Sequence, residues 1–290
     1  MSSYRHVARV VTPQSVIEGA GVRLKRSIAT SALNYLDPFL LFDHFGSDNP
    51  DDYLAGFPMH PHRGIETVTY MLSGNVRHAD SIGNSGHIYG GDVQWMTSGG
   101  GIMHEEMPEP VDGQMEGFQL WVNLPASLKM SEPRYQEIKK EAIPVVRPEN
   151  GITVRIIAGL YHGQSGAVTE VAIQPLYLDV ELCPKTVFEM EIPETHTVFS
   201  YLYSGEISFG VQDEIVRAPR LVVLEQGDHV RVQSHVRNAR FLLVAGQPIY
   251  QPIARYGPFV MNTQSEIEEA LDDLRKGTFI WSEKVKTLSF

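Results

Sequence analysis

Cysteine is nearly absent from this sequence, since Cys183 is the single cysteine among 290 residues. A disulfide within the chain and a structural zinc site built from several cysteines are therefore excluded. We expect the Cys183 thiol to be an inert group of the core or the surface. Basic residues are also few: 24 lysines and arginines stand against 35 acidic residues, a formal net charge of −11. This balance argues against direct binding of nucleic acid or of anionic membranes.

Long apolar runs are absent as well. No stretch approaches the length of a membrane helix, and the N-terminal residues MSSYRHVARVV lack the apolar segment and the cleavage site of a signal peptide. The sequence therefore predicts a soluble protein that does not bind membranes. We expect it in the cytoplasm, or also in the nucleus if the source is a eukaryote. Its length allows one large domain or two ordinary ones.

Short apolar runs separated by turn residues are what the sequence has in quantity. Segments such as TVTYML, LYLDVEL, VFSYLYSG and FLLVAG recur along the chain, which also contains 25 glycines and 18 prolines. Glycine, proline, asparagine and aspartate separate these runs at short intervals. This pattern favours an all-β sandwich or barrel over a fold of alternating strands and helices.

One helix is predicted near the C-terminus. Thr263 followed by Glu266 has the pattern of a capping box, and Lys276 with Gly277 provides a stop signal. The apolar stripe between these signals consists of Ile267, Ala270, Leu271 and Leu274. The stretch EPRYQEIKKEAIP, residues 132–144, is charged in its middle and has a proline near each end. This stretch suits a linker between two domains. We expect the linker to contain a second, short helical piece.

The chain repeats itself weakly. TYMLSGNV from Thr69 resembles SYLYSGEI from Ser200, and GGDVQWMTSG from Gly90 resembles EQGDHVRVQS from Glu225. Two similar β domains in tandem would explain both pairs. Chance similarity between β-rich segments is the alternative.

Two histidines flank one proline in the stretch FPMHPHRG. Residues two apart in a strand point to the same face, so an extended His60-Pro61-His62 presents two imidazoles side by side. Pro61 favours the extended conformation of His60 and lacks an N–H group, which argues against a fully paired central strand. Two imidazoles need further ligands to hold a metal ion tightly.

Those ligands are candidates in the stretch GGGIMHEEMPEP, where His104 and Glu106 also stand two apart after a glycine run. If this segment is a strand, the two strands offer three imidazoles and one carboxylate. That set suits Fe(II), Mn(II), Ni(II), Cu(II) or Zn(II), and an open coordination position would make the site catalytic. Ordinary surface histidines are the alternative for an isolated His-x-His pair.

The sequence resembles the pirins, a branch of the cupin superfamily. The resemblance lies in the motifs GFPMHPHRGIETVTYMLSG and GGDVQWMTSGGGIMHEEMP, and also in LDPFLLFDHF, FQLWVNLP and GPFVMNT. It implies an all-β bicupin: two tandem cupin β-barrels with a short linker and a C-terminal α-helix. The expected division is 1–137 for a metal-binding N-terminal cupin domain, 138–145 for the linker and 146–290 for a C-terminal cupin domain without metal ligands.

The resemblance also implies one mononuclear divalent metal ion in the first barrel. Carried over by motif position, its ligands are His60, His62, His104 and Glu106. Fe(II) is the first choice, with Mn, Ni, Co, Cu and Zn as the other metals considered. Glu66, at the glutamate position of the general cupin motif, is expected outside the ligand set, because pirins take their carboxylate from the second motif. Glu105 is expected to face away from Glu106 on a strand.

The second barrel is expected to lack a metal site. Aligning the Ser-Gly turns puts Glu191 and Pro193 opposite His60 and His62, and aligning the Gly-Asp pairs puts Arg240 and Leu242 opposite His104 and Glu106. Three histidines of this half, His196, His229 and His235, lack the paired spacing and are expected at the surface or at the edge of the core.

The function implied by the resemblance is a quercetin 2,3-dioxygenase-type reaction, in which a flavonol ring is opened with O2 and carbon monoxide is released. Glu106 would be the catalytic base that takes the 3-hydroxyl proton. Phe57 is expected to contact the flat substrate. Phe39, Phe45, Trp95 and Met103 are weaker candidates for this contact.

Two other functions stay open. The first is a regulatory binding protein that senses metal or redox state through the same ion, acting on a transcription factor or a metabolic enzyme as a protein partner. The second is a cupin acting on another small aromatic compound or on an enediol. A monomer is expected in each case.

Overall fold

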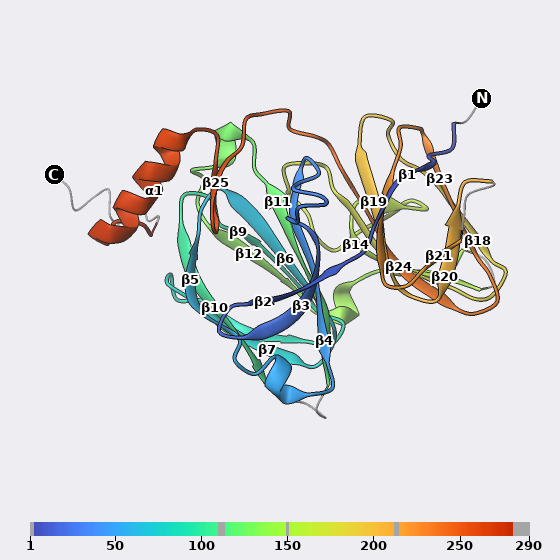
Figure 1. Cartoon of the computed structure of the whole chain (residues 1–290), viewed down its shortest axis with the longest axis horizontal. Helices are drawn as coiled ribbons and strands as arrows, with labels where there is room; N and C mark the ends of the chain where they lie inside the picture. The colour runs from blue at the N-terminus through green and yellow to red at the C-terminus, as the bar shows by residue number, and fades with distance from the viewer. Residues whose placement is uncertain (1–2, 110–113, 149–150, 212–214, 281–290) are drawn as a thin grey trace. The chain divides into compact units, whose positions relative to one another are not determined.

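The computed structural model describes residues 3–109, 114–148, 151–211 and 215–280 (Figure 1). They form two compact units built from antiparallel sheets. The N-terminal barrel contains Ser15–Ala29, Phe39–Lys140 and the described part of Ile249–Phe290. The C-terminal barrel contains the described residues of Met1–Gln14, Thr30–Pro38 and Glu141–Pro248. The predicted all-β fold of two cupin barrels with a C-terminal helix is confirmed.

The N-terminal barrel packs a seven-stranded sheet against a four-stranded sheet. The larger sheet has the order β12 (Arg134–Ile138), β9 (Val93–Thr97), β6 (Ile65–Ser73), β11 (Met115–Asn123), β4 (Phe39–Ser47), β3 (Val22–Ile28), β2 (Gln14–Glu18). The smaller sheet has the order β5 (Phe57–His62), β10 (Ile102–Glu109), β7 (Asn75–Asp80), β8 (Ser85–Tyr89). Short 3-10 helices η1 (Pro50–Asp52) and η2 (Ala126–Leu128) lie in its connections.

The C-terminal barrel has the same construction. Its larger sheet has the order β1 (Val7–Val11), β22 (Arg220–Leu224), β19 (Thr197–Ser204), β24 (Ala239–Gly246), β17 (Leu176–Leu182), β14 (Ile152–Ala158), β13 (Val145–Val146). Its smaller sheet has the order β18 (Val187–Glu191), β23 (His229–Ser234), β20 (Glu206–Phe209), β21 (Val216–Arg217). The hairpin β15 (Leu160–Tyr161) and β16 (Gln164–Ser165) stands apart.

The seven-stranded sheets of the two barrels match strand for strand, and so do the four-stranded sheets, so each strand of these sheets has a counterpart in the other barrel. The Ser-Gly repeat falls on counterparts: β6 and β19 each end in serine, and each is followed by a glycine of positive φ, Gly74 at 84° and Gly205 at 82°. A left-handed turn residue of this kind favours glycine, which explains why both repeats keep it. The Gly-Asp repeat does not fall on counterparts, because it joins β9 to β23.

The two ends of the chain do not follow the predicted division, which placed the boundary between the domains at residues 138–145. The strand β1 near the N-terminus pairs with β22 of the C-terminal barrel, with Val11 opposite Leu221. The last described residues belong instead to the N-terminal barrel, where they form the hairpin β25 (Ala254–Tyr256) and β26 (Phe259–Met261) and the helix α1 (Gln264–Lys276). The units are therefore not contiguous stretches of sequence.

The C-terminal helix is confirmed in its details. Both halves of the capping box between Thr263 and Glu266 are present, and the helix ends at Gly277 with a φ of 73°. Ile267 and Ala270 are buried in a cluster with Phe259 and Phe279. The helical piece expected within residues 132–144 is mostly a strand, since β12 occupies Arg134–Ile138 and a single 3-10 turn, η3 (Lys140–Ala142), follows. In β12 the pairing with β9 outweighs the helical propensity of its charged residues.

The interiors of the two barrels differ. Inward residues of both sheets fill the C-terminal barrel with a continuous apolar core that runs from Ile152 to Ala245. In the N-terminal barrel a smaller apolar cluster that includes Phe45, Met71 and Met115 occupies part of the interior.

Within the described residues, no helix has the length and apolar composition needed to cross a bilayer. The Cys183 thiol is exposed.

Candidate metal centre

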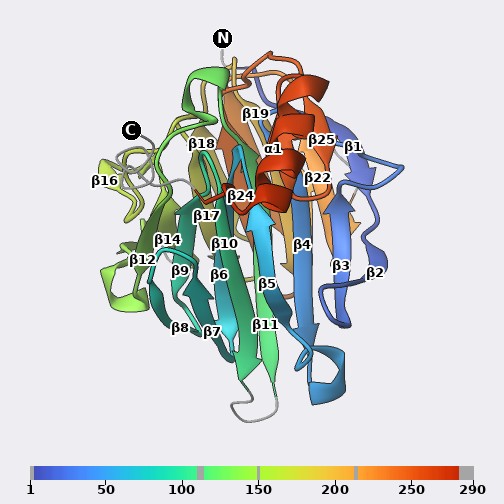
Figure 2. The same ribbon diagram turned by 90° about the vertical axis from the view of Figure 1, so that its left-hand side faces the viewer.

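Strands β5 and β10 are neighbours in the N-terminal barrel (Figure 2). Together they bring three histidines close to one another. His104 is opposite His60 in the antiparallel register, and Ile102 is opposite His62. The ring centroids of His60 are 4.8 Å from His62 and 4.4 Å from His104, and those of His62 and His104 are 5.0 Å apart. β5 is an edge strand of its sheet, where the missing N–H of Pro61 is tolerated.

Glu106 comes from the same strand as His104 and lies in the wall of the cavity that His60 and His62 also line. Thr69 Oγ1 lies 3.0 Å from Glu106 Oε1 and 2.7 Å from Gln119 Oε1. A hydroxyl has one hydrogen to donate, so Thr69 can donate to Glu106 when the Gln119 amide nitrogen faces the hydroxyl. The tight cluster itself, with ligand atoms within 4.8 Å of one another, comprises the three histidines.

The residues present fit a metal ion. His60 Nε2 and His62 Nε2 are 3.0 Å apart, and two nitrogens bound at right angles to one ion at about 2.1 Å would be separated by about 3.0 Å. His60 Nδ1 is 2.9 Å from the Pro58 carbonyl, the kind of backbone contact that orients a ligating imidazole. Within the described structure neither ring nitrogen of His104 has a hydrogen-bond partner, although both are buried. A buried imidazole without a partner is costly unless something else binds it.

Burial also sets the charge of these groups. It holds the pKa of His62 and His104 well below the ordinary value, with His60 adding to the effect in both cases. Both imidazoles are therefore neutral at neutral pH, as metal coordination requires. Burial raises the pKa of Glu106, against the opposing effects of His60 and of the Thr69 hydrogen bond. A nearby cation would favour its ionised form.

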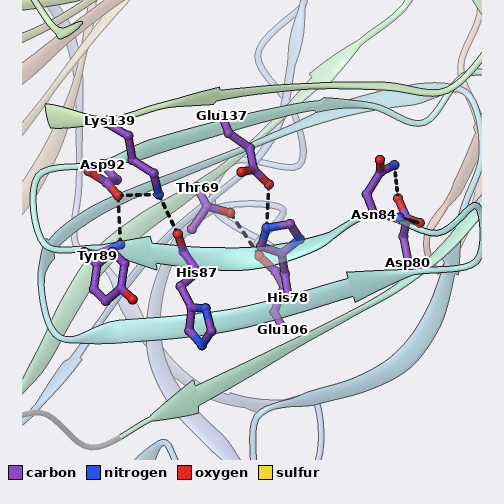
Figure 3. A network of polar contacts seen from close by, with 10 residues as sticks. All are labelled: Thr69, His78, Asp80, Asn84, His87, Tyr89, Asp92, Glu106, Glu137 and Lys139. Carbon is purple, nitrogen blue, oxygen red and sulfur yellow. Dashed lines mark hydrogen bonds and ion pairs between the residues drawn. The ribbon is translucent and has the colours of Figure 1, made fainter. Parts of the chain in front are cut away.

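A polar network lies beside Glu106 (Figure 3). His78 on β7 is opposite Glu106 in the strand register and is buried, and its Nε2 lies 2.6 Å from Glu137 Oε1. A Cβ on Gly86 would come within 2.8 Å of His78 Nε2, so the absence of a side chain there makes room for this pair. Sequence reasoning did not single out His78, because its proximity to Glu106 comes from strand pairing.

The cavity has a volume of about 600 Å³, within the usual range for small-molecule sites. Phe57 lines it, with its ring centroid 6.5 Å from that of His60. Among the weaker candidates, Phe45 lines it too. Phe39, Trp95 and Met103 are not among its lining residues, and the first two are buried in the core.

Trp121 and Arg255 were not predicted and line the same cavity. The Trp121 ring lies edge-on to His62 at 5.1 Å, and the Arg255 guanidinium lies 5.1 Å from the Trp121 ring centroid. Arg26 is held by both oxygens of Asp43, at 2.9 and 2.8 Å, and by Glu18 at 2.7 Å. The cavity therefore combines aromatic walls with a charged, hydrogen-bonding region.

Glu66 and Glu105 lie away from the cavity. Glu66 is buried and accepts a hydrogen bond of 2.8 Å from Thr97 Oγ1, opposite it on β9. Glu105 is opposite Ala79 in the β7 register. It forms an ion pair of 2.9 Å with Arg77, two residues before Ala79 on the same strand. Alternation along β10 buries His104 and Glu106 and leaves Glu105 partly exposed.

The C-terminal barrel has apolar side chains where the N-terminal barrel has the histidines. The counterpart of β10 is β23, whose buried residues are Val230, Val232 and Ser234. The alignment that placed Arg240 and Leu242 opposite His104 and Glu106 is wrong. Both residues lie on β24, the counterpart of β11, because the Gly-Asp repeat joins strands that are not equivalent.

The other histidines of the second half do not form a cluster of this kind in the described residues. His229 pairs with Asp228 at 2.7 Å, and His235 lies 3.2 Å from Ser208. His196 is buried, and burial lowers its pKa. Glu191, expected opposite His60, does lie on β18, the counterpart of β5, at its exposed end.

Two barrels of matching sheet order, with a histidine cluster inside one of them, define a two-domain cupin protein. The Pirin family model matches residues 21–122, and the model of the Pirin C-terminal cupin domain matches residues 177–280. The chain belongs to the pirin family.

Individual relatives agree with this assignment. A pirin-like protein of Caulobacter vibrioides is 47% identical, over 95% of this chain and 99% of the relative. Human pirin is 43% identical, over 95% of this chain and 94% of the relative. Among solved structures, quercetin 2,3-dioxygenase from Acinetobacter baumannii is 33% identical with a TM-score of 0.88, over 96% of this chain and 99% of that chain.

Proposed function

We propose that this protein is a metal-dependent dioxygenase of the quercetin 2,3-dioxygenase type, which opens a flavonol ring with O2. The observation that supports it best is that the cluster of three imidazoles lies beside an aromatic-walled cavity of about 600 Å³. The name of the related Acinetobacter baumannii structure supports the same reaction class.

Four side chains would hold one divalent metal ion, with Fe(II) as the first choice. They are His60, His62, His104 and Glu106. Imidazole and carboxylate ligands suit several first-row metals, so cellular supply would decide among them. When bound, the ion would act as a Lewis acid that makes a coordinated flavonol hydroxyl more acidic.

Glu106 would act as the general base for the 3-hydroxyl proton. A carboxylate whose pKa is raised by burial accepts a proton at neutral pH more readily than an exposed one. Thr69 would keep the carboxylate oriented through its 3.0 Å contact with Oε1. Phe57 and Trp121 would hold the flat substrate beside the histidines and exclude water from it.

Aerobic incubation of the metal-loaded protein with quercetin tests the proposal. We expect the flavonol absorbance to decay with release of one carbon monoxide per quercetin consumed, in the Fe(II) form or in one of the Mn, Ni, Co and Cu forms. Absence of turnover with all of these metals, in samples whose metal content is measured, would overturn it. The metal-free protein is the matched control.

A further inference from the structure

The C-terminal arm, residues 249–280, packs against the segment that follows His62, although nearly two hundred residues separate them in sequence. The Val260 N–H donates to the Arg63 carbonyl at 3.1 Å. Lys129 Nζ joins the same two segments, since it donates to the Gly64 carbonyl at 2.9 Å and to the Val260 carbonyl at 2.8 Å. The backbone next to His62 is thus fixed by the arm.

An ion pair between the buried Arg63 and the partly exposed Asp273 adds a side-chain link. Arg63 is 2% exposed, and its Nη1 lies 2.8 Å from Asp273 Oδ2 on α1. Its Nη2 donates to the Phe279 carbonyl at 3.2 Å, and its guanidinium lies 4.6 Å from the centroid of the Phe279 ring. Figure 2 shows α1 beside the end of β5, where His62 is located. The residue next to His62 is therefore anchored to the arm through three kinds of contact.

The arm packs so closely against the segments that contain His62 and His104 that there is no space for a side chain at the nearest glycine of either segment. A Cβ on Gly64 would lie 2.0 Å from the Val260 carbonyl oxygen, and a Cβ on Gly101 would lie 2.3 Å from the Phe279 carbonyl oxygen. Gly64 stands two residues after His62, and Gly101 three residues before His104. The backbone of the arm therefore packs directly against the backbone of both segments.

The arm also reaches the cavity that His62 lines. In the described structure the buried Nδ1 of His62 has no hydrogen-bond partner. Gly257 and Pro258 belong to the cavity wall next to His60 and His62. Groups that touch the outer side of a metal ligand set its orientation and the affinity of the site.

We propose that the C-terminal arm positions the metal centre. In this proposal the ion pair between Arg63 and Asp273 fixes the backbone next to His62 and thereby orients the His62 ring. This inference rests on the metal site of the proposed function. Arg63 and Asp273 are positioning residues, because they act through the His62 backbone and touch neither metal nor substrate. The arm therefore tunes metal affinity from outside the ligand set.

Two neighbouring aspartates of α1 provide a matched pair of variants. Asp273→Asn removes the charge that holds Arg63, whereas Asp272→Asn removes an exposed pair with Lys276 on the same helix. Metal affinity is measured by competition with a chromogenic chelator, and coordination geometry by the visible absorption of the Co(II) form. Loss of an outer partner of a metal ligand costs about 10–100-fold in affinity, and Asp273 acts one residue further out, so we expect a loss of about tenfold.

Support requires a loss of affinity and an altered Co(II) spectrum in Asp273→Asn, wild-type values in Asp272→Asn, and recovery of affinity in Asp273→Glu. Recovery in the conservative variant separates positioning from general destabilisation. Equal affinities for wild type and Asp273→Asn, or equal losses in the two Asn variants, would overturn the inference. If the wild-type protein binds no metal, the proposed centre fails with it. Absence of quercetin turnover would count against the dioxygenase function alone.

Discussion

Replacement of His62 by alanine is the sharpest test of the proposed ligand set. The side chain is 2% exposed, and its ring lies 4.8 to 5.1 Å from the rings of His60, His104 and Trp121. His62→Ala removes one of the three clustered imidazoles. It leaves His60 and His104 opposite each other on β5 and β10.

The expected effects on metal binding and on folding differ in size. Loss of an outer partner already costs about 10–100-fold in metal affinity, so loss of a ligand should cost more than about 100-fold, or about 2.7 kcal/mol. Truncation of a buried side chain destabilises a fold by about 2–5 kcal/mol. Here it also removes a buried Nδ1 atom without a hydrogen bond, which offsets about 1–3 kcal/mol of that cost. The midpoints of these two ranges differ by about 1–2 kcal/mol, a net loss that is small beside a typical stability of about 5–15 kcal/mol.

Elemental analysis and chelator competition measure the first effect, and urea unfolding of the metal-free protein measures the second. His87→Ala is the matched control, because His87 lies on β8 of the same barrel with a side chain that is 39% exposed. Metal content of His62→Ala equal to that of wild type would show that the ligand assignment is wrong. Unfolding of the variant before metal loading would show that the ring is needed for the fold itself.

Three further predictions concern neighbouring groups. Glu106→Gln keeps the shape of the side chain and removes the base, so the flavonol turnover rate should fall by about 10²–10⁴-fold in single-turnover assays of metal-loaded samples. Phe57→Ala should weaken quercetin binding about 3–10-fold through the lost ring contact, as measured by equilibrium titration. Burial lowers the pKa of Lys129 to about 7, against about 10.4 for an unfolded lysine, so the folded state binds fewer protons between these values and stability should rise with pH across that window. Urea unfolding should show this slope in wild type and its loss in Lys129→Met; equal slopes would contradict the reasoning.

The sequence predicted the parts of the fold that depend on residues close to one another along the chain. The capping box at Thr263 and the stop at Gly277 mark the limits of α1 because both are short-range hydrogen-bonding devices. The Ser-Gly turn after β6 recurs after β19 for the same reason. The pairing of β1 with β22 has no such signal, since strand partners more than two hundred residues apart leave no mark in either segment alone.

The candidate site divides in the same way. His60 and His62 share a local pattern that the sequence displays, and the second histidine motif provided His104 and Glu106. Trp121, Arg255 and His78 had no local pattern, because each reaches the site from a strand placed there by long-range pairing. Their individual sequence contexts are those of ordinary strand residues. Strand register, and not residue type, identifies them.

The two barrels share one construction but differ inside, so the chemistry depends on the side chains and not on the barrel. Counterpart strands β10 and β23 occupy the same place in sheets of the same order, yet one turns His104 and Glu106 inward and the other turns Val230 and Val232 inward. Apolar residues at these positions join a closed core, whereas imidazoles and a carboxylate leave buried polar atoms that need a partner. In this way one barrel contributes the stability of a filled interior. The other keeps a cavity, and under the proposed function a metal ion and a substrate would satisfy its polar groups.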